Sequence, residues 1–145
     1  MPWPKPSNKT ASGRTPMNGK LLLDTNAVVA LFRRDAGVQL RLAGAAEVFV
    51  PIIVLGELHY GAAHSARAAE NHAQVDQFAA ASSILLCDLV TARRYGQLKQ
   101  GLSRKGRPIP ENDIWIAALA MQYSLTVVSL DKHFGEVDGL SIEAW

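Results

Sequence analysis

The sequence has almost none of the features that distinguish secreted and membrane proteins. Cys87 is the only cysteine among 145 residues, so an internal disulfide is excluded and a reducing compartment is expected. No apolar run approaches the roughly 20 residues that cross a bilayer, and the N-terminus has no apolar core like that of a signal peptide. We therefore expect a cytoplasmic protein with no membrane partner.

Charged residues are also scarce. They make up only 19% of the chain, whereas hydrophobic residues make up 48%. This balance is typical of a folded globular protein and excludes a chain that is disordered over most of its length. A chain of this size can bury roughly two-thirds of its unfolded surface in a single core, so we expect one domain.

The first 18 residues lack an apolar period. They contain four prolines and several small polar residues, and they cannot bury enough surface to offset the entropy lost on ordering. We predict a disordered leader at 1–18 and a single domain at 19–145. Met17 precedes the first predicted strand and is a candidate translation start, in which case residues 1–16 are an upstream extension.

Acidic residues are missing from two stretches. The first 20 residues contain Lys5, Lys9, Arg14 and Lys20, which leaves 11 of the 15 basic side chains and all 13 acidic ones in the rest of the chain. The formal charge of +2 therefore does not make the body of the protein basic. The second stretch holds six basic residues with no acid between them: Arg93, Arg94, Lys99, Arg104, Lys105 and Arg107. It is either a solvated helix face or a surface that contacts the RNA backbone.

Four acids stand out because they lie in apolar segments. Asp24 ends the run Leu-Leu-Leu-Asp, which predicts a buried strand that delivers a carboxylate to its own carboxyl end, where parallel sheets bind ligands. Glu57, Asp113 and Asp131 have similarly apolar neighbours. A carboxylate in such surroundings is costly unless it is paired, hydrogen-bonded or bound to a metal. Oxygen ligands select hard cations, which favours Mg²⁺ or Mn²⁺ over zinc.

The histidines and two of the aromatic residues have a simpler interpretation. The histidines show no zinc-binding spacing and are expected on the surface or in packing; they are His59, His64, His72 and His133. Trp115 and Tyr123 are expected in the core rather than as platforms for stacking bases.

Apolar periodicity and turn residues predict strands that alternate with helices. The predicted helices cover 27–34, 38–45, 52–63, 66–81, 89–105 and 110–122, and the predicted strands cover 21–24, 48–51, 83–87, 126–130 and 140–143. Thr25 or Asn26 is expected to cap the first helix. This alternation predicts a parallel sheet with helices on both faces.

Five segments, in this order, resemble the PIN-domain ribonucleases and, within them, the VapC-type toxins. They are LLDTNAV at 22–28, PIIVLGELHYGA at 51–62, IPENDIWIAA at 109–118, VVSLDKHF at 127–134 and EAW at 143–145. The resemblance implies a three-layer α/β/α fold with a central, mostly parallel sheet. It also implies the toxin of a type II toxin–antitoxin system, acting as a Mg²⁺- or Mn²⁺-dependent endoribonuclease.

The same resemblance assigns residues and partners. The four acids Asp24, Glu57, Asp113 and Asp131 occupy the acidic positions of the family, with Asp24 and Asp113 as the leading metal ligands. Asn26 and Ser129 match polar positions that support the metal site. The implied partners are the RNA substrate, a cognate VapB-type antitoxin whose C-terminal segment lies across the active-site groove, and a second copy in a homodimer. Arg104, Lys105 and Arg107 are the residues most expected to contact RNA.

Two other functions compete with this one. A haloacid-dehalogenase-type phosphotransferase also begins with an apolar strand ending in Asp, but it needs a second Asp where this chain has Asn26. A catalytically silent PIN-like module that binds RNA or protein is the non-enzyme alternative. Loss of one acidic position would indicate such a module, and all four acids are present.

Overall fold

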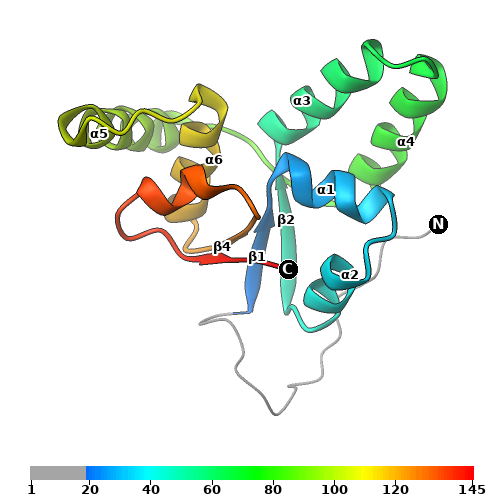
Figure 1. Cartoon of the computed structure of the whole chain (residues 1–145), viewed down its shortest axis with the longest axis horizontal. Coiled ribbons are helices and arrows are strands. Elements are labelled where there is room, and N and C mark those ends of the chain that lie inside the picture. The colour runs from blue at the N-terminus through cyan, green and yellow to red at the C-terminus, as the bar shows by residue number, and fades with distance from the viewer. Residues whose placement is uncertain (1–18) are drawn as a thin grey trace.

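The computed structural model describes residues 19–145, so the predicted leader at 1–18 and the candidate start at Met17 lie outside the described residues. Within residues 19–145 the chain forms five strands, six α-helices and one short 3-10 helix (Figure 1). In chain order these are β1 (Lys20–Leu23), α1 (Thr25–Phe32), α2 (Ala36–Ala43), β2 (Glu47–Pro51), α3 (Ile52–Ala63), α4 (Ala68–Ala80), β3 (Ser83–Leu85), α5 (Leu89–Lys105), α6 (Glu111–Gln122), β4 (Thr126–Val128), η1 (Lys132–Glu136) and β5 (Ile142–Glu143).

Every predicted helix and strand is present, and the differences lie at their ends. β4 ends at Val128 rather than at residue 130, and β5 is shorter than the predicted 140–143. The 3-10 helix η1 has no counterpart among the predicted elements, because a five-residue turn has no apolar period to detect. In the described part of the chain, no helix combines the length and apolar character that crossing a membrane requires.

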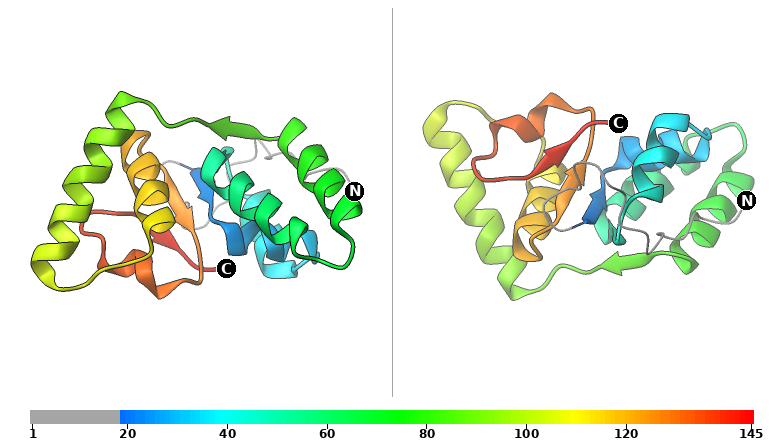
Figure 2. Two further views of the ribbon diagram at one scale, coloured as in Figure 1. Left: turned by 90° about the horizontal axis from the view of Figure 1, so that it is seen from above. Right: turned by 90° about the horizontal axis from the view of Figure 1, so that it is seen from below.

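The sheet has the strand order β3-β2-β1-β4-β5 and is parallel at every pairing, which confirms the predicted fold class. The chain runs outward from β1 through β2 to β3 and then crosses back to place β4 against the other edge of β1. Right-handed crossovers in opposite directions put helices on opposite faces. Figure 2 shows α5 and α6 on one side of the strands and α3 and α4 on the other. The strand order reverses between β1 and β4, and α/β sheets bind ligands at the carboxyl ends of such a strand pair.

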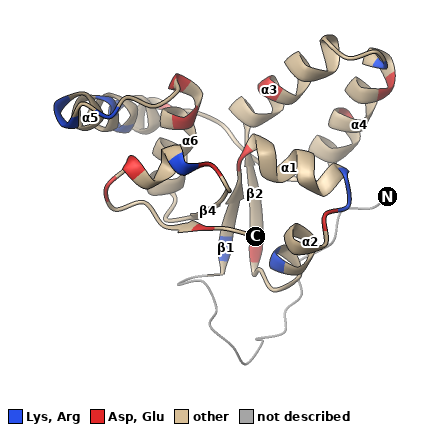
Figure 3. Ribbon diagram, viewed as in Figure 1, with Lys and Arg blue, Asp and Glu red and all other residues tan. Residues whose placement is uncertain are grey.

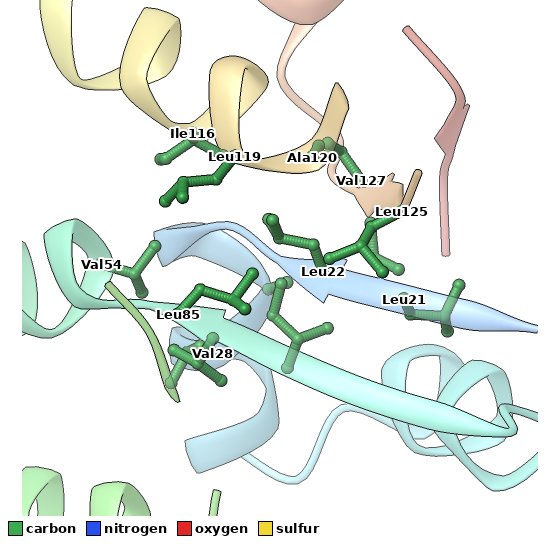
Figure 4. Packing of buried hydrophobic residues seen from close by; sticks show 14 of the residues in the cluster. Leu21, Leu22, Val28, Val54, Leu85, Ile116, Leu119, Ala120, Leu125 and Val127 are labelled. Atoms are coloured by element: carbon green, nitrogen blue, oxygen red, sulfur yellow. The ribbon is translucent and has the colours of Figure 1, made fainter. Parts of the chain in front are cut away.

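The central strand β1 is buried on both faces. Leu21, Leu22 and Leu23 are inaccessible to solvent. Figure 4 shows Ile116 and Leu119 of α6 on one side of the strands and Val28 of α1 on the other. Burial of one leucine side chain contributes about 1.5–3 kcal/mol to stability, so the core holds β1 firmly. This strand ends at Leu23, and the position of Asp24 is therefore fixed by the core.

The prediction that Trp115 and Tyr123 lie in the core is partly correct for Trp115 and wrong for Tyr123. Trp115 is half-buried and stacks on Tyr95 of α5, with ring centroids 4.0 Å apart. Tyr123 is 44% exposed, so placing it in the core is wrong. Tyr123 is the C-terminal cap of α6, where the helix ends shortly before β4.

Candidate active site

A pocket of about 360 Å³ contains all four predicted acids. They reach it from four parts of the chain: Asp24 follows β1, Glu57 lies on α3, Asp113 lies in the first turn of α6, and Asp131 precedes η1. The pocket is lined by Asp24, Thr25, Asn26, Glu57, Pro110, Glu111, Asn112, Asp113, Asp131 and His133. Figure 3 shows acidic segments at the junction of β1 with α1 and at the start of α6.

Asp24 is the most deeply buried of the four, at 4% exposure. Its Oδ1 accepts the N–H of Ala27 at 2.8 Å, and its backbone is extended, so Asp24 caps α1. The prediction that Thr25 or Asn26 caps this helix is therefore wrong by one or two residues. Burial raises the pKa of Asp24 above its usual value, although the hydrogen bonds from Ser129 and Ala27 oppose the shift. The carboxylate is thus held in place and kept out of bulk water.

Ser129 connects two of the acids. Its hydroxyl donates to Oδ2 of Asp24. Its hydroxyl oxygen, Oγ, also accepts the backbone N–H of Asp131 at 2.9 Å. Ser129 is buried, directly follows β4 and is not among the residues that line the pocket. Asn26 does line the pocket, from the first turn of α1. The two predicted supporting residues therefore lie in different places, one behind the acids and one beside them.

Asp113 and Asp131 meet at His133. Nδ1 of His133 lies 2.9 Å from Oδ1 of Asp131 and 3.3 Å from Oδ2 of Asp113. The three side chains offer ligand atoms within 4.8 Å of one another, an arrangement that can hold a metal ion. Burial is the main cause that raises the pKa of Asp113 to about 6; the charge of Asp131 adds to the increase and His133 opposes it. His133 is a surface residue, as expected, but it also contacts two of the acids, which its spacing in the sequence did not indicate.

Two oxygens of the pocket lining lack partners. Oε1 of Glu57 and Oγ1 of Thr25 are buried, and neither has a hydrogen-bond partner within the described residues. An unpaired buried polar atom costs about 1–3 kcal/mol, so atoms of this kind commonly mark a bound ion or water. Carboxylate and hydroxyl oxygens with one imidazole nitrogen form a donor set that fits a divalent cation such as Mg²⁺ or Mn²⁺.

Glu111 is a fifth acid at the pocket that the sequence did not single out. Its Oε1 lies 2.6 Å from Nζ of Lys99, and its Oε2 accepts a hydrogen bond from the hydroxyl of Tyr95. Lys99 is the main cause that lowers the pKa of Glu111. The charge of this acid is therefore matched by a lysine of α5, unlike the four acids above. The sequence shows that Glu111 lies two residues before Asp113, but it does not show that Glu111 pairs with residues of α5.

The six basic residues do not act as one group. Lys99 pairs with Glu111, and Lys105 pairs with Asp138 at 2.9 Å and donates to the carbonyl of Glu136. Within residues 19–145, no ion pair joins Arg93, Arg104 or Arg107 to a carboxylate, and the set of pocket-lining residues includes none of the six: Arg93, Arg94, Lys99, Arg104, Lys105 and Arg107. Figure 3 shows basic segments at the end of α5 farthest from α3 and α4. Contact between this surface and RNA stays a prediction.

Comparison with known proteins gives one consistent family. The model of the PIN domain matches residues 21–140. Ribonuclease VapC2 of Haemophilus influenzae is 36% identical over 129 residues, which cover 87% of this chain and 98% of that protein. The tRNA(fMet)-specific endonuclease VapC of Shigella flexneri is 31% identical, with the same two coverages. The solved structure of DNA-bound VapBC from Salmonella typhimurium has a TM-score of 0.80 at 31% identity and covers 87% of this chain and 98% of its matched chain.

Proposed function

This chain belongs to the PIN domain family as a VapC-type ribonuclease, and we propose that its acidic pocket hydrolyses RNA phosphodiester bonds with Mg²⁺ or Mn²⁺ as cofactor. The observation that carries this proposal is the convergence of Asp24, Glu57, Asp113 and Asp131 in one pocket from segments spread over more than a hundred residues. Like charges repel, so such convergence is costly unless a cation or bound protons offset it. A catalytically silent module would gain nothing from holding four repelling carboxylates together.

The proposed cation ligands are Asp24 and Asp113. Asp24 is suited to this role because hydrogen bonds from Ala27 and Ser129 fix its orientation and leave further lone pairs on both oxygens. Asp113 lies in the first turn of α6, where the helix dipole favours negative charge. Its raised pKa fits a group whose charge is stabilised by a bound cation rather than by water.

Glu57 and Asp131 complete the proposed set, by holding the cation or by orienting the attacking water. Glu57 has a buried oxygen that can accept a hydrogen bond from that water. Asp131 is fixed by the backbone N–H of His133, which donates to its Oδ1 at 2.9 Å. The side chain of His133 can hold a proton at Nδ1 between Asp131 and Asp113 and so reduce their repulsion in the metal-free protein.

A bound divalent cation supplies a water of lowered pKa and stabilises the charge that develops on the phosphoryl oxygens. The protein excludes bulk water from Asp24 and aligns four carboxylates before RNA arrives. Because these groups are already oriented, little reorganisation is needed when the phosphodiester binds. Arg104, Lys105 and Arg107 are proposed to contact the RNA backbone beyond the pocket.

The proposed partners follow from the same family. The similarity to a VapBC complex supports a VapB-type antitoxin as the partner that inhibits this protein. We also propose that the chain forms a homodimer and acts in the cytoplasm, where its RNA substrate is found. A tRNA is the first substrate class to examine, since one relative is named for cleavage of tRNA(fMet).

Sequencing the 5′ ends of cellular RNA after brief induction tests activity and target together. Wild type should create new 5′ ends at a small number of positions, and Asp24→Asn should create none at matched expression. The same new ends in cells that express Asp24→Asn, or no new ends with wild type, would contradict the proposed function.

A further inference from the structure

Two histidines outside the acidic pocket face each other across a helical hairpin. His59 lies on α3 and His72 on α4, and these helices pack side by side (Figure 1). The two Nδ1 atoms are 2.8 Å apart, and the rings are stacked with their centroids 5.1 Å apart. Neither histidine lines the pocket that contains the four acids. The proposed ribonuclease chemistry therefore gives this pair no role.

We propose that His59 and His72 form a second metal site that binds a transition-metal dication, with Cu²⁺ or Ni²⁺ as the best fit. Metal–imidazole bonds are about 2.0–2.1 Å long, so two nitrogens at right angles around a metal are about 2.8–3.0 Å apart, whereas tetrahedral ligands are about 3.3–3.4 Å apart. The observed separation of 2.8 Å matches the right-angle arrangement. Tetragonal sites with nitrogen and oxygen ligands are typical of Cu²⁺ and Ni²⁺.

Asp76 supplies the support that such a site needs. Its Oδ1 lies 3.5 Å from Nε2 of His59, the ring nitrogen that does not face His72. A carboxylate at this position favours the tautomer with hydrogen on Nε2 and leaves the Nδ1 lone pair for a metal. Histidine ligands in metalloproteins usually have a carboxylate, carbonyl or water beside their second ring nitrogen. Asp76 therefore acts as a positioning residue.

Solvent can reach the pair. The side chain of His59 is 39% exposed and that of Asp76 is 74% exposed, so a cation can enter with water as its remaining ligands. A metal would replace the single proton shared between the two Nδ1 atoms and would connect α3 to α4. His64, the C-terminal cap of α3, provides a natural comparison, because its Nδ1 contacts the carbonyl of Tyr60 in the last turn of that helix at 3.0 Å.

The test is a calorimetric titration of the metal-free, full-length protein with Ni²⁺. Wild type should show a site that His72→Gln weakens by at least about tenfold, and Asp76→Asn should weaken it by about tenfold. His64→Gln serves as the matched control and should leave this site unchanged. Asp113→Asn should also leave it unchanged, which separates it from any Ni²⁺ that the acidic pocket takes up. Ni²⁺ should raise the melting temperature of wild type more than that of His72→Gln.

Cu²⁺ bound to the same proteins gives a direct view of the ligands. The electron paramagnetic resonance spectrum of wild type should show coupling to two imidazole nitrogens, and that of His72→Gln should show coupling to fewer. Equal Ni²⁺ affinity in wild type and His72→Gln would overturn the proposal, and so would equal losses in His72→Gln and His64→Gln. His72→Gln should cleave RNA like wild type, so this site can fail without affecting the proposed function.

Discussion

The hydroxyl of Ser129 donates a hydrogen bond to Oδ2 of Asp24 across 105 positions of sequence. It joins the carboxyl ends of β4 and β1, the two strands between which the sheet order reverses. Since the hydroxyl oxygen of Ser129 also accepts the N–H of Asp131, one hydroxyl sets the positions of two proposed catalytic acids. Removing an interaction that orients a metal ligand commonly lowers metal affinity or activity by about 10- to 100-fold.

Ser129→Ala should therefore reduce RNA cleavage by about 10- to 100-fold. The substitution leaves Oδ2 of Asp24 buried without its donor, which should lower the free energy of unfolding by about 1–3 kcal/mol. Cleavage rates and urea unfolding of the purified protein measure the two effects. Ser83→Ala, on the exposed end of β3, is the control and should change neither. Wild-type activity in a Ser129→Ala protein would show that this hydroxyl does not position the acids.

The raised pKa of Asp113 predicts how the stability of the metal-free protein depends on pH. The folded state holds this proton up to about pH 6, whereas the unfolded state releases it near pH 4. The folded state therefore binds more protons between these values, and stability falls as pH rises through that window. The side chain is 16% exposed, and the expected loss is on the order of 1 kcal/mol.

Asp113→Asn cannot ionise and should show less of this loss. Melting temperatures in EDTA at a series of pH values should converge at low pH and favour the variant above pH 6. If the variant melts below wild type above pH 6, ionised Asp113 does not destabilise the metal-free fold as its raised pKa predicts.

The ion pair between Lys99 and Glu111 predicts an effect on substrate binding. Lys99→Met would leave the Glu111 carboxylate unmatched at the edge of a pocket that receives phosphates. We expect KM for RNA to rise by about two- to fivefold with little change in kcat, the size of effect that one exposed ion pair gives.

A matched pair of variants separates charge from structure. The double variant Lys99→Met with Glu111→Gln should restore KM, because it removes the unmatched charge. Arg67→Met breaks an exposed ion pair with Glu70 at the start of α4, outside the pocket, and should leave KM unchanged. An effect on kcat alone would assign Lys99 to the chemistry instead.

The basic surface of α5 predicts a graded salt dependence. Lys105 is already occupied by Asp138 and the carbonyl of Glu136, whereas Arg104 and Arg107 have no such ion pair among the described residues. Arg104→Ser and Arg107→Ser should each reduce the slope of log affinity against log salt by about one unit. Lys105→Ser should reduce it less. Equal slopes for wild type and both arginine variants would leave the arginines as solvated surface.

The sequence predicts elements well where a local signal ends them. Pro51 ends β2 and opens α3 because it cannot donate to a strand ladder, and both predicted boundaries are confirmed. Gly106 ends α5 at Lys105 with a φ of 67°, a conformation that glycine adopts without strain. Asp24 was predictable for a related reason, since a buried strand must place its next residue at the ligand-binding edge.

Residue contacts between distant elements were not predictable in the same way. His133 contacts Asp113 because η1 turns the chain back toward α6, and no apolar period marks that turn. The pairing of His59 with His72 depends on how α3 and α4 pack, which spacing within either helix does not reveal.

The rate of RNA cleavage by the purified protein, with and without divalent cation, tests the central claim most directly. Wild type should lose activity in EDTA and recover it when Mn²⁺ or Mg²⁺ is restored. Asp113→Asn should remain folded, gain little melting temperature from Mn²⁺, and cleave more than about 100-fold more slowly under the same conditions. Cleavage by wild type that persists in EDTA, or cleavage at the wild-type rate by folded Asp113→Asn, would contradict a metal-dependent active site built on these four carboxylates.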